Sequence, residues 1–327
     1  IDGYSMFIMA EYLNRYLKGC PIIAKNTQSY KEYIQKEKFY IESKRYQKDF
    51  LFWSEQFSLN PCCSIFEDKK TSFDYKSNEV NFRIGNNIFN KIKAFCDNKN
   101  ISVQTYFNTV YSLYIYRTLG VEFFTLGVPV LNRTTEAELN TIGLYMNIVP
   151  LVVKISNESF LKNALNIEDA QLNLFRHQKF TQYDIKELLK EEGKPHNNLF
   201  DIATDYQEFE GNDDYEFEFI YSNYLSVPLE IHMQSLRAEK HNLKIRYRTS
   251  MFSEKEIQTI LNSIIAIAEE EPPPPPALTF SGTAPSRNAA LSLSSATDNV
   301  FSSVLSSGWI FAVASGVNSG KDFSFCF

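Results

Sequence analysis

Polar side chains that could bind or orient a substrate lie at three separate points of this 327-residue sequence. Asp2 and Gly3 precede an apolar helical stretch, Arg133 follows a predicted strand, and Asn147 ends the segment 142–147. An amide such as Asn147 can donate a hydrogen bond to a bound substrate or to charge that develops during a reaction. It can equally satisfy backbone groups at the end of a strand. The sequence leaves both roles open for Asn147.

Histidine is the most frequent general base in enzymes, and the sequence has four histidines. His177 falls at the predicted end of a helix, which favours a C-terminal capping or surface role. His196, His232 and His241 lie in loop or polar strand positions, and we expect none of the three to have a paired acid. We therefore predict no catalytic histidine among these four.

The composition excludes several classes of function. The net charge of −6 disfavours nucleic acid as a partner, since phosphate binding calls for a concentrated basic surface. No apolar run reaches the roughly 18 residues of a membrane span. The five cysteines (Cys20, Cys62, Cys63, Cys96 and Cys326) follow neither a zinc-site nor a disulfide spacing. We expect a cytoplasmic protein with reduced thiols and no metal site.

The elements that position these residues follow from hydrophobic periodicity. Residues 4–58 predict two helices, and the pattern from 78 to 271 alternates strands and helices. The predicted helices are 4–19, a long second helix up to residue 58, 87–97, 102–119, one capped by Ser156 or Asn157 and running to about 178, and a last one opened by the capping box of Ser253 and Glu256. The predicted strands are 78–84, 122–130, 148–155, 199–207, 215–221, 227–236 and 242–248.

Two of these elements allow predictions about packing. In the helix 102–119, one face carries Val103, Phe107, Val110, Tyr114 and Thr118, so we expect that face to pack on a sheet. The strand 242–248 alternates strictly, with Lys244, Arg246 and Arg248 on the face opposite Leu243, Ile245 and Tyr247. Glu216 and Glu218 would pair with these cations if the strand 215–221 were its neighbour.

The composition changes after Glu271. Five consecutive prolines, Pro272 to Pro276, stop any helix, and the residues beyond them are rich in serine and almost uncharged. We interpret residues 272–327 as a low-complexity tail that is disordered. The short apolar run from Trp309 to Val313 is the one part of it with strand character.

Six segments, in order along the chain, resemble motifs of the condensation domains of nonribosomal peptide synthetases. Ile1-Asp2-Gly3-Tyr4-Ser5 resembles the end of the family's His-His-x-x-x-Asp-Gly motif, and Ile142-Gly143-Leu144-Tyr145-Met146-Asn147 is close to its I-G-x-F-V-N segment. The remaining four are segments 46–53, 126–133, 176–178 and 197–202, and the six together cover roughly residues 1 to 270.

The resemblance implies an α+β fold, the two-lobe sandwich of chloramphenicol-acetyltransferase-like proteins. Residues 1–70 would be the remnant of the N-terminal lobe with its connecting helices, and 71–271 the C-terminal lobe. Both motif histidines would lie upstream of residue 1, so we expect an N-terminally truncated fragment that is inactive as given. In the family the motif aspartate pairs with an upstream arginine. We therefore expect Asp2 to be a solvated terminal carboxylate.

The reaction implied is amide-bond formation between an acyl or peptidyl thioester and an aminoacyl amine, each presented by a carrier protein. Its partners are carrier proteins and neighbouring synthetase domains, and its cofactor is phosphopantetheine presented by those carriers, with none bound directly. The resemblance implies catalytic roles for Asp2, Gly3 and Asn147, in which Gly3 lets the backbone turn. It implies substrate-binding roles for Gly143, Tyr145 and Arg133, the last of which lies either in the floor of the cleft or in a surface ion pair.

Two alternatives to a condensation domain stay open. An epimerisation domain or another acyltransferase of the same superfamily has the same fold, and epimerisation domains retain the same histidine motif. A module that docks carrier proteins without catalysis would need the surface but not the base. The sequence does not identify the acyl donor, the amino-acid acceptor or the peptide product.

Overall fold

The computed structural model describes residues 1–21, 26–59, 64–66, 69, 74–194, 198–209, 216–236, 240–270 and 311–315. Its helices are α1 (Gly3–Leu17), α2 (Tyr30–Ile41), α3 (Lys44–Leu59), α4 (Asn86–Lys99), α5 (Val103–Leu119), α6 (Glu136–Leu139), α7 (Phe160–Arg176), α8 (Gln182–Glu191) and α9 (Glu254–Glu270). Its strands are β1 (Ser77–Ile84), β2 (Phe123–Val130), β3 (Asn147–Lys154), β4 (Ile202–Phe209), β5 (Glu216–Ile220), β6 (Leu229–Leu236), β7 (Lys240–Arg248) and β8 (Phe311–Ser315).

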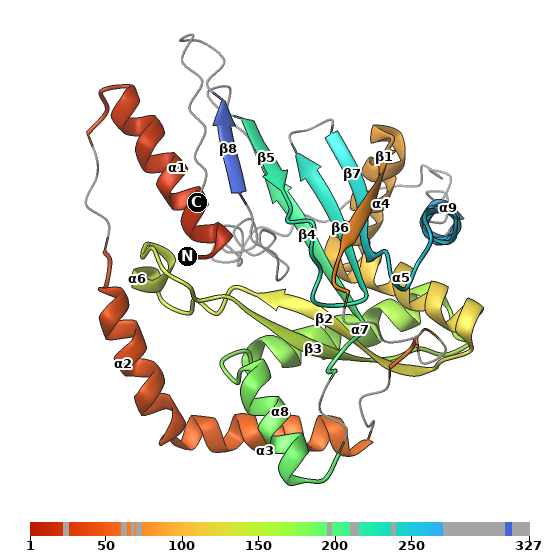
Figure 1. Cartoon of the computed structure of the whole chain (residues 1–327), viewed down its shortest axis with the longest axis horizontal. Coiled ribbons are helices and arrows are strands. Elements are labelled where there is room, and N and C mark those ends of the chain that lie inside the picture. The colour runs from red at the N-terminus through yellow and green to blue at the C-terminus, as the bar shows by residue number, and fades with distance from the viewer. Residues whose placement is uncertain are drawn as a thin grey trace, which may run out of the picture.

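Six strands form the main sheet, in the order β1-β7-β6-β4-β2-β3 (Figure 1). Two of its pairings, β2 with β4 and β4 with β6, are parallel, and the others are antiparallel. The strands β5 and β8 pair antiparallel in a separate two-stranded sheet. The mixed pairing and the helices between the strands make an α+β fold, as the sequence predicts.

The strand β5 is not a neighbour of β7, so the condition for cross-strand pairs of Glu216 and Glu218 with the cations of β7 is not met. The neighbours of β7 are β1 and β6, so its cations meet carboxylates there. Lys244 Nζ lies 2.9 Å from Glu79 Oε1, and Arg246 Nη1 lies 2.5 Å from Glu230 Oε2. The cations of β7 therefore do form cross-strand ion pairs. Their partners could not be predicted, because the sequence pattern of one strand does not show which strands lie beside it.

The helix α5 lies at the centre of the core and packs against α7 and α9 as well as the sheet. All nine residues from Thr105 to Leu113 are buried, on every side of the helix. The expectation of a single buried face is therefore too narrow. The polar residues on α5 find partners inside the core: Asn108 Nδ2 donates to Gln171 Oε1 at 2.6 Å, and Thr204 Oγ1 donates to Asn108 Oδ1 at 2.8 Å.

Several helix boundaries differ from the predictions because side chains cap at other positions. The second predicted helix is divided in two, with Ser43 Oγ accepting from the Tyr46 N–H at 3.2 Å at the start of α3. Ser159 caps α7, in place of Ser156 or Asn157. The capping box of Ser253 and Glu256 at α9 is confirmed. The hydrophobic pattern did not predict α6 and α8, and Thr135 and Thr181 open these with capping boxes of their own.

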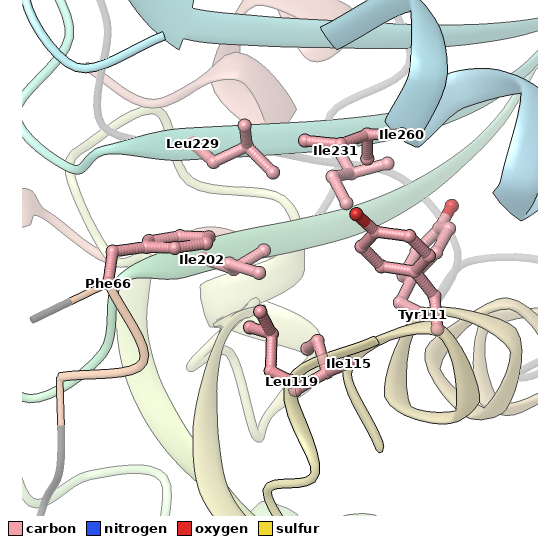
Figure 2. Close-up of a pocket in the computed structure, with 9 residues that line it drawn as sticks. Phe66, Tyr111, Ile115, Leu119, Ile202, Leu229, Ile231 and Ile260 are labelled. Carbon is pink, nitrogen blue, oxygen red and sulfur yellow. The ribbon is translucent and has the colours of Figure 1, made fainter. Parts of the chain in front are cut away.

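A small apolar pocket lies between α5, α9 and the strands β4 and β6 (Figure 2). Ile202, Leu229 and Ile231 reach it from the sheet, and Ile115 and Leu119 reach it from α5. Tyr111 also lines it, and its hydroxyl has no hydrogen-bond partner among the described residues. Burial raises the pKa of Tyr111 well above its usual value, so the phenol is neutral.

Within the part of the chain that the structure describes, no helix is both long and apolar enough to cross a membrane. The same residues contain no group of three or more side chains suited to hold a metal ion. The described cysteines Cys20 and Cys96 are free thiols, exposed and buried respectively. The predicted tail lies outside the described residues except for β8, which includes Phe311 and Val313 of the apolar run.

Candidate functional site

Asp2 is the N-cap of α1 and is buried, with 4% of its surface exposed. Its Oδ1 accepts from the Ser5 N–H at 2.9 Å, which satisfies one of the free N–H groups at the helix start. Its Oδ2 accepts from the backbone N–H groups of Tyr145 at 3.0 Å and Met146 at 3.3 Å. The carboxylate thus joins the start of α1 to a segment more than 140 residues away.

The positive partner of Asp2 is Arg133, whose Nη2 lies 3.0 Å from Asp2 Oδ1 and 3.1 Å from Oδ2. The expectation of a solvated carboxylate with its arginine elsewhere is wrong. Both charges are buried, with side-chain exposures of 1% for Asp2 and 0% for Arg133. The local sequence around Asp2 does not predict this pair, because Arg133 follows β2, far along the chain. Asp2 is stable in the interior because a guanidinium and three N–H donors replace its water.

Arg133 is buried and contacts several segments of the chain, so the alternative of a surface ion pair is wrong. Its Nη1 donates to the carbonyl oxygens of Glu138 and Thr141, the latter at 2.5 Å. Its guanidinium carbon lies 4.0 Å from the centre of the Tyr145 ring and 4.9 Å from that of Tyr4. One side chain therefore binds the loop after β2, the segment before β3 and the start of α1 together.

Gly143 lies against the ring of Tyr30 on α2. A Cβ atom there would come within 2.3 Å of the Tyr30 ring, so any larger residue would displace that ring. The Asp2 N–H donates to the Gly143 carbonyl at 3.1 Å, and the Gly143 N–H donates to Ser5 Oγ at 3.0 Å. Gly3, by contrast, is the first residue of α1 and has no left-handed backbone angle. The chain here enters the helix directly.

Tyr145 is buried and its ring lies against other aromatic rings as well as against Arg133. Its ring centroid is 4.0 Å from that of Tyr33 and 5.7 Å from that of Tyr30, both on α2. The adjacent side chains of Ile142 and Leu144 point outward, with exposures of 39% and 56%. The segment 142–147 therefore buries Gly143 and Tyr145 against the ion pair and presents apolar side chains on its outer surface.

Asn147 begins β3 and donates its two amide protons to backbone carbonyls. Its Nδ2 lies 3.3 Å from the Gln178 oxygen and 3.2 Å from the Phe180 oxygen. Of the two roles that the sequence left open, this geometry favours the satisfaction of backbone groups, because both N–H donors are already used. Asn147 holds the turn before α8 against the start of β3.

His177 is the C-cap residue of α7, as predicted, but it also has an acidic partner. Its Nδ1 lies 2.7 Å from Asp49 Oδ1, and its ring stacks on Phe52 with centroids 3.9 Å apart. Asp49, on α3, is fully buried and also accepts from Tyr40 at 2.6 Å. The pair fastens α3 to the end of α7. The structure brings neither of its residues into contact with Asp2 or Arg133.

The expectation that His232 has no paired acid is wrong. This residue is buried on β6, with Nδ1 2.8 Å from Asp205 Oδ1 and Nε2 3.2 Å from Glu230 Oε2. Burial alone would lower its pKa, but the two carboxylates outweigh burial and raise the pKa of His232 to about 9. The cross-strand register of Asp205 with His232 could have been found only from the pairing of β4 with β6.

The two remaining histidines are His241 and His196. His241 stacks on Phe89 at 3.7 Å and lies 3.1 Å from Ser235 Oγ, and burial lowers its pKa. Its contacts therefore differ from those of His232, which lies between two carboxylates. His196 lies outside the described residues. The arrangement around Asp2 therefore fixes a loop and a helix start, and the three described histidines have other places in the fold.

Comparison with known proteins identifies the family of this chain. A family model described as Condensation domain matches residues 1–270. One of the plipastatin synthase subunits of Bacillus subtilis (strain 168) is 25% identical over 283 residues, covering 82% of this chain and 11% of that protein. Surfactin synthase subunit 1 of the same organism is 25% identical over 279 residues, covering 82% of this chain and 8% of that protein. The chain thus spans only a small part of the length of these curated relatives.

Solved structures agree on the fold. The first condensation domain of the calcium-dependent antibiotic synthetase aligns with a TM-score of 0.68 at 16% identity, covering 83% of this chain and 62% of that one. The epimerization domain from the third module of tyrocidine synthetase B aligns with a TM-score of 0.67 at 13% identity, covering 82% and 66%. With the family model matching 270 of its 327 residues, this chain belongs to the condensation domain family.

Proposed function

We propose that this chain contributes to amide-bond formation between a carrier-bound acyl or peptidyl thioester and a carrier-bound aminoacyl amine. The observation that carries the proposal is the buried pair of Asp2 and Arg133. It joins two segments that resemble motifs of the family, Asp-Gly at residues 2–3 and the more specific I-G-L-Y-M-N at 142–147. A reaction between two tethered substrates requires fixed positions for both, and this pair fixes the loop beside them.

The residues have distinct proposed roles. Asp2 and Gly3 set the direction of α1. Arg133, Gly143 and Tyr145 hold the segment 142–147 against the start of that helix. Asn147 is a positioning residue that fixes the turn before α8. The apolar side chains of Ile142 and Leu144 are the surface that we propose to face the substrate arm, which is phosphopantetheine supplied by a carrier protein.

The proton of the attacking amine requires an acceptor or an orienting group. The printed sequence contains no adjacent pair of histidines, and its four histidines are separate. We propose that this role belongs to the second histidine of a His-His-x-x-x segment joined directly to Ile1. A base of this kind contributes about 10²–10⁴-fold to the rate.

The experiment compares two proteins with the same carrier substrates. The first is the 327-residue chain, and the second carries an N-terminal lobe ending in His-His-x-x-x before Ile1. Dipeptidyl-carrier product is measured by mass spectrometry, and binding by titration with a phosphopantetheinylated carrier. We expect both proteins to bind the carrier and the second alone to form product above background. Robust condensation by the first would refute the role of the motif histidine, and failure of both to bind would refute the proposal.

A carrier-docking module without catalysis is the second candidate. It is favoured by the exposed apolar side chains of Ile142 and Leu144, which a docked partner would cover. In that case the second protein would bind carriers and form no product. An epimerisation domain would instead change the configuration of the carrier-bound aminoacyl group, which chiral analysis of the released amino acid detects.

A further inference from the structure

The strand β1 forms one edge of the six-stranded sheet, where it pairs with β7 (Figure 1). Two hydrogen bonds fix which of its backbone groups face outward. On the β7 side the Thr249 N–H donates to the Lys76 carbonyl at 3.0 Å, and on the outer side the Ser77 N–H donates to the Asn223 carbonyl at 2.8 Å. Backbone direction alternates along a strand, so every second residue after Ser77 presents its N–H and C=O groups outward.

Three exposed residues follow this outer edge: Glu79, Asn81 and Arg83. Because they are two positions apart, their side chains share one face of the sheet. The Glu79 N–H donates to Asn78 Oδ1 at 2.9 Å, and this exposed side chain can give way to the carbonyl of another strand. The edge therefore has the backbone groups that a further strand would pair with.

The charges on the edge have opposite signs and a self-complementary spacing. Asn81 lies midway between Glu79 and Arg83. If two copies of β1 pair antiparallel about Asn81, each Glu79 lies opposite Arg83 of the other copy. Pairing about Glu79 or Arg83 would place like charges opposite each other, and pairing about Val80 or Phe82 would leave both charges without an opposite partner. One two-fold register therefore matches both charges, and it does so twice.

This register also continues the charge pattern of the sheet. Glu230, Arg246 and Glu79 are cross-strand neighbours on β6, β7 and β1. Arg246 Nη1 lies 2.5 Å from Glu230 Oε2, so the first two already form an ion pair. Arg83 of a second copy would follow Glu79 in the same row. The signs then alternate across the junction between the copies, from one sheet into the other.

Both charged groups have capacity for the added contact. Lys244 and Asn81 donate to Glu79 Oε1 at 2.9 and 3.3 Å, and among the described residues no hydrogen bond goes to Oε2. Arg83 takes part in other interactions, but its guanidinium has five N–H donors. An ion pair between the copies would therefore add to the present contacts without replacing them.

The opposite face of β1 is apolar. Val80 is buried there and Phe82 is half-buried. In the register about Asn81, Val80 lies opposite Phe82 of the other copy, and such a cross-strand pair covers part of the ring that is now exposed. Charged residues on an edge strand often prevent association, because a second copy brings like charges against them. The spacing in β1 reverses that effect.

We propose that two copies of this chain associate through β1, paired antiparallel about Asn81, so that their sheets join into one. At the centre, Asn81 of each copy exchanges two backbone hydrogen bonds with Asn81 of the other. The backbone pairing provides affinity, and the two pairs of Glu79 with Arg83 fix the register. A contact made by one short strand is small, so the dimer should be weak, with a Kd of about 100 µM.

The test is charge reversal in the 327-residue chain, followed by sedimentation equilibrium from about 5 to about 500 µM. Glu79→Lys places a lysine opposite Arg83, and Arg83→Glu places a glutamate opposite Glu79. Each variant alone should associate about tenfold more weakly than the unsubstituted chain. An equimolar mixture of the two should recover association, because both pairs in the mixed dimer have opposite charges. The double variant should recover it alone.

Glu187→Lys is the matched control. Glu187 is an exposed residue of α8, which packs against β3 at the opposite edge of the sheet. This charge reversal should leave association unchanged. Amide hydrogen exchange locates the contact, since the Asn81 N–H should exchange more slowly as the protein concentration rises. Recovery in the mixture also shows that the single variants are folded.

Three results would overturn the inference. The first is a monomer mass at every concentration. The second is association that neither single reversal weakens, which would place the contact elsewhere, for example in residues 272–327. The third is a mixture of Glu79→Lys and Arg83→Glu that associates no more strongly than each variant alone.

Discussion

Arg133 and Asp2 are 131 positions apart in the sequence, yet one guanidinium nitrogen of Arg133 contacts both oxygens of the Asp2 carboxylate. Both side chains are buried. In a buried pair, each charge is tolerated because the other is present, so the loss of one partner costs more than the pair itself contributes. This relationship determines the first prediction.

Arg133→Met should lower the free energy of unfolding by about 3–5 kcal/mol, because it leaves the Asp2 carboxylate buried without its cation. The measurement is urea unfolding at pH 7. The control is Lys93→Met, which removes an exposed ion pair with Glu208 and should cost at most about 1 kcal/mol. Equal losses in the two variants would show that Asp2 and Arg133 are not a buried pair in solution.

Gly143→Ala should cost about 1–3 kcal/mol, because the new methyl group would lie 2.3 Å from the Tyr30 ring. Thermal unfolding followed by circular dichroism measures the loss. A second substitution, Tyr30→Ala, should recover part of it by removing the obstructing ring. Gly85→Ala is the control, since a Cβ there meets nothing within 4 Å. If Tyr30→Ala adds to the loss in full, the two residues do not touch.

The pH dependence of stability should reveal His232. Its pKa is raised from 6.5 to about 9 in the folded protein, so the charged histidine stabilises the fold fully below pH 6.5. That contribution is lost as the pH rises toward 9. Unfolding free energies at about pH 6 and about pH 9 should therefore differ in the unsubstituted protein and differ less in His232→Gln. The matching substitution His241→Gln should not reduce this difference. Burial lowers the pKa of His241, so this residue makes stability rise with pH, opposite to the effect of His232.

Tyr111→Phe should raise the free energy of unfolding by about 1 kcal/mol. The Tyr111 hydroxyl is buried beside the apolar pocket and has no partner among the described residues, so its desolvation is uncompensated. Urea unfolding measures the gain. Asn108→Leu, which would break two side-chain hydrogen bonds in the same helix, should have the opposite sign. A loss on Tyr111→Phe would mean that the hydroxyl has a partner, such as a buried water.

The fold class could be predicted from the sequence, because alternation and periodicity located the strands of the main sheet. The segment 142–147 stood out through its resemblance to a family motif, and its role in a site remains a proposal. The partner of Asp2 could not be predicted, since it follows β2 and only the closed fold brings it near. The pairing of Asp205 with His232 could not be predicted for the same reason, since it depends on β4 lying beside β6. Patterns along the chain specify elements, whereas contacts between distant elements depend on strand order.

We propose that the Asp2–Arg133 pair holds in place a motif used for amide-bond formation. The most direct test is the rate of dipeptidyl-carrier formation, measured by mass spectrometry in the protein that carries a His-His-x-x-x lobe before Ile1. Arg133→Met should reduce this rate by about 10²-fold while carrier binding changes little, since a misplaced motif loop affects orientation more than docking. Lys93→Met should leave the rate unchanged. An unchanged rate in Arg133→Met, or no product from any of these proteins despite carrier binding, would contradict the claim.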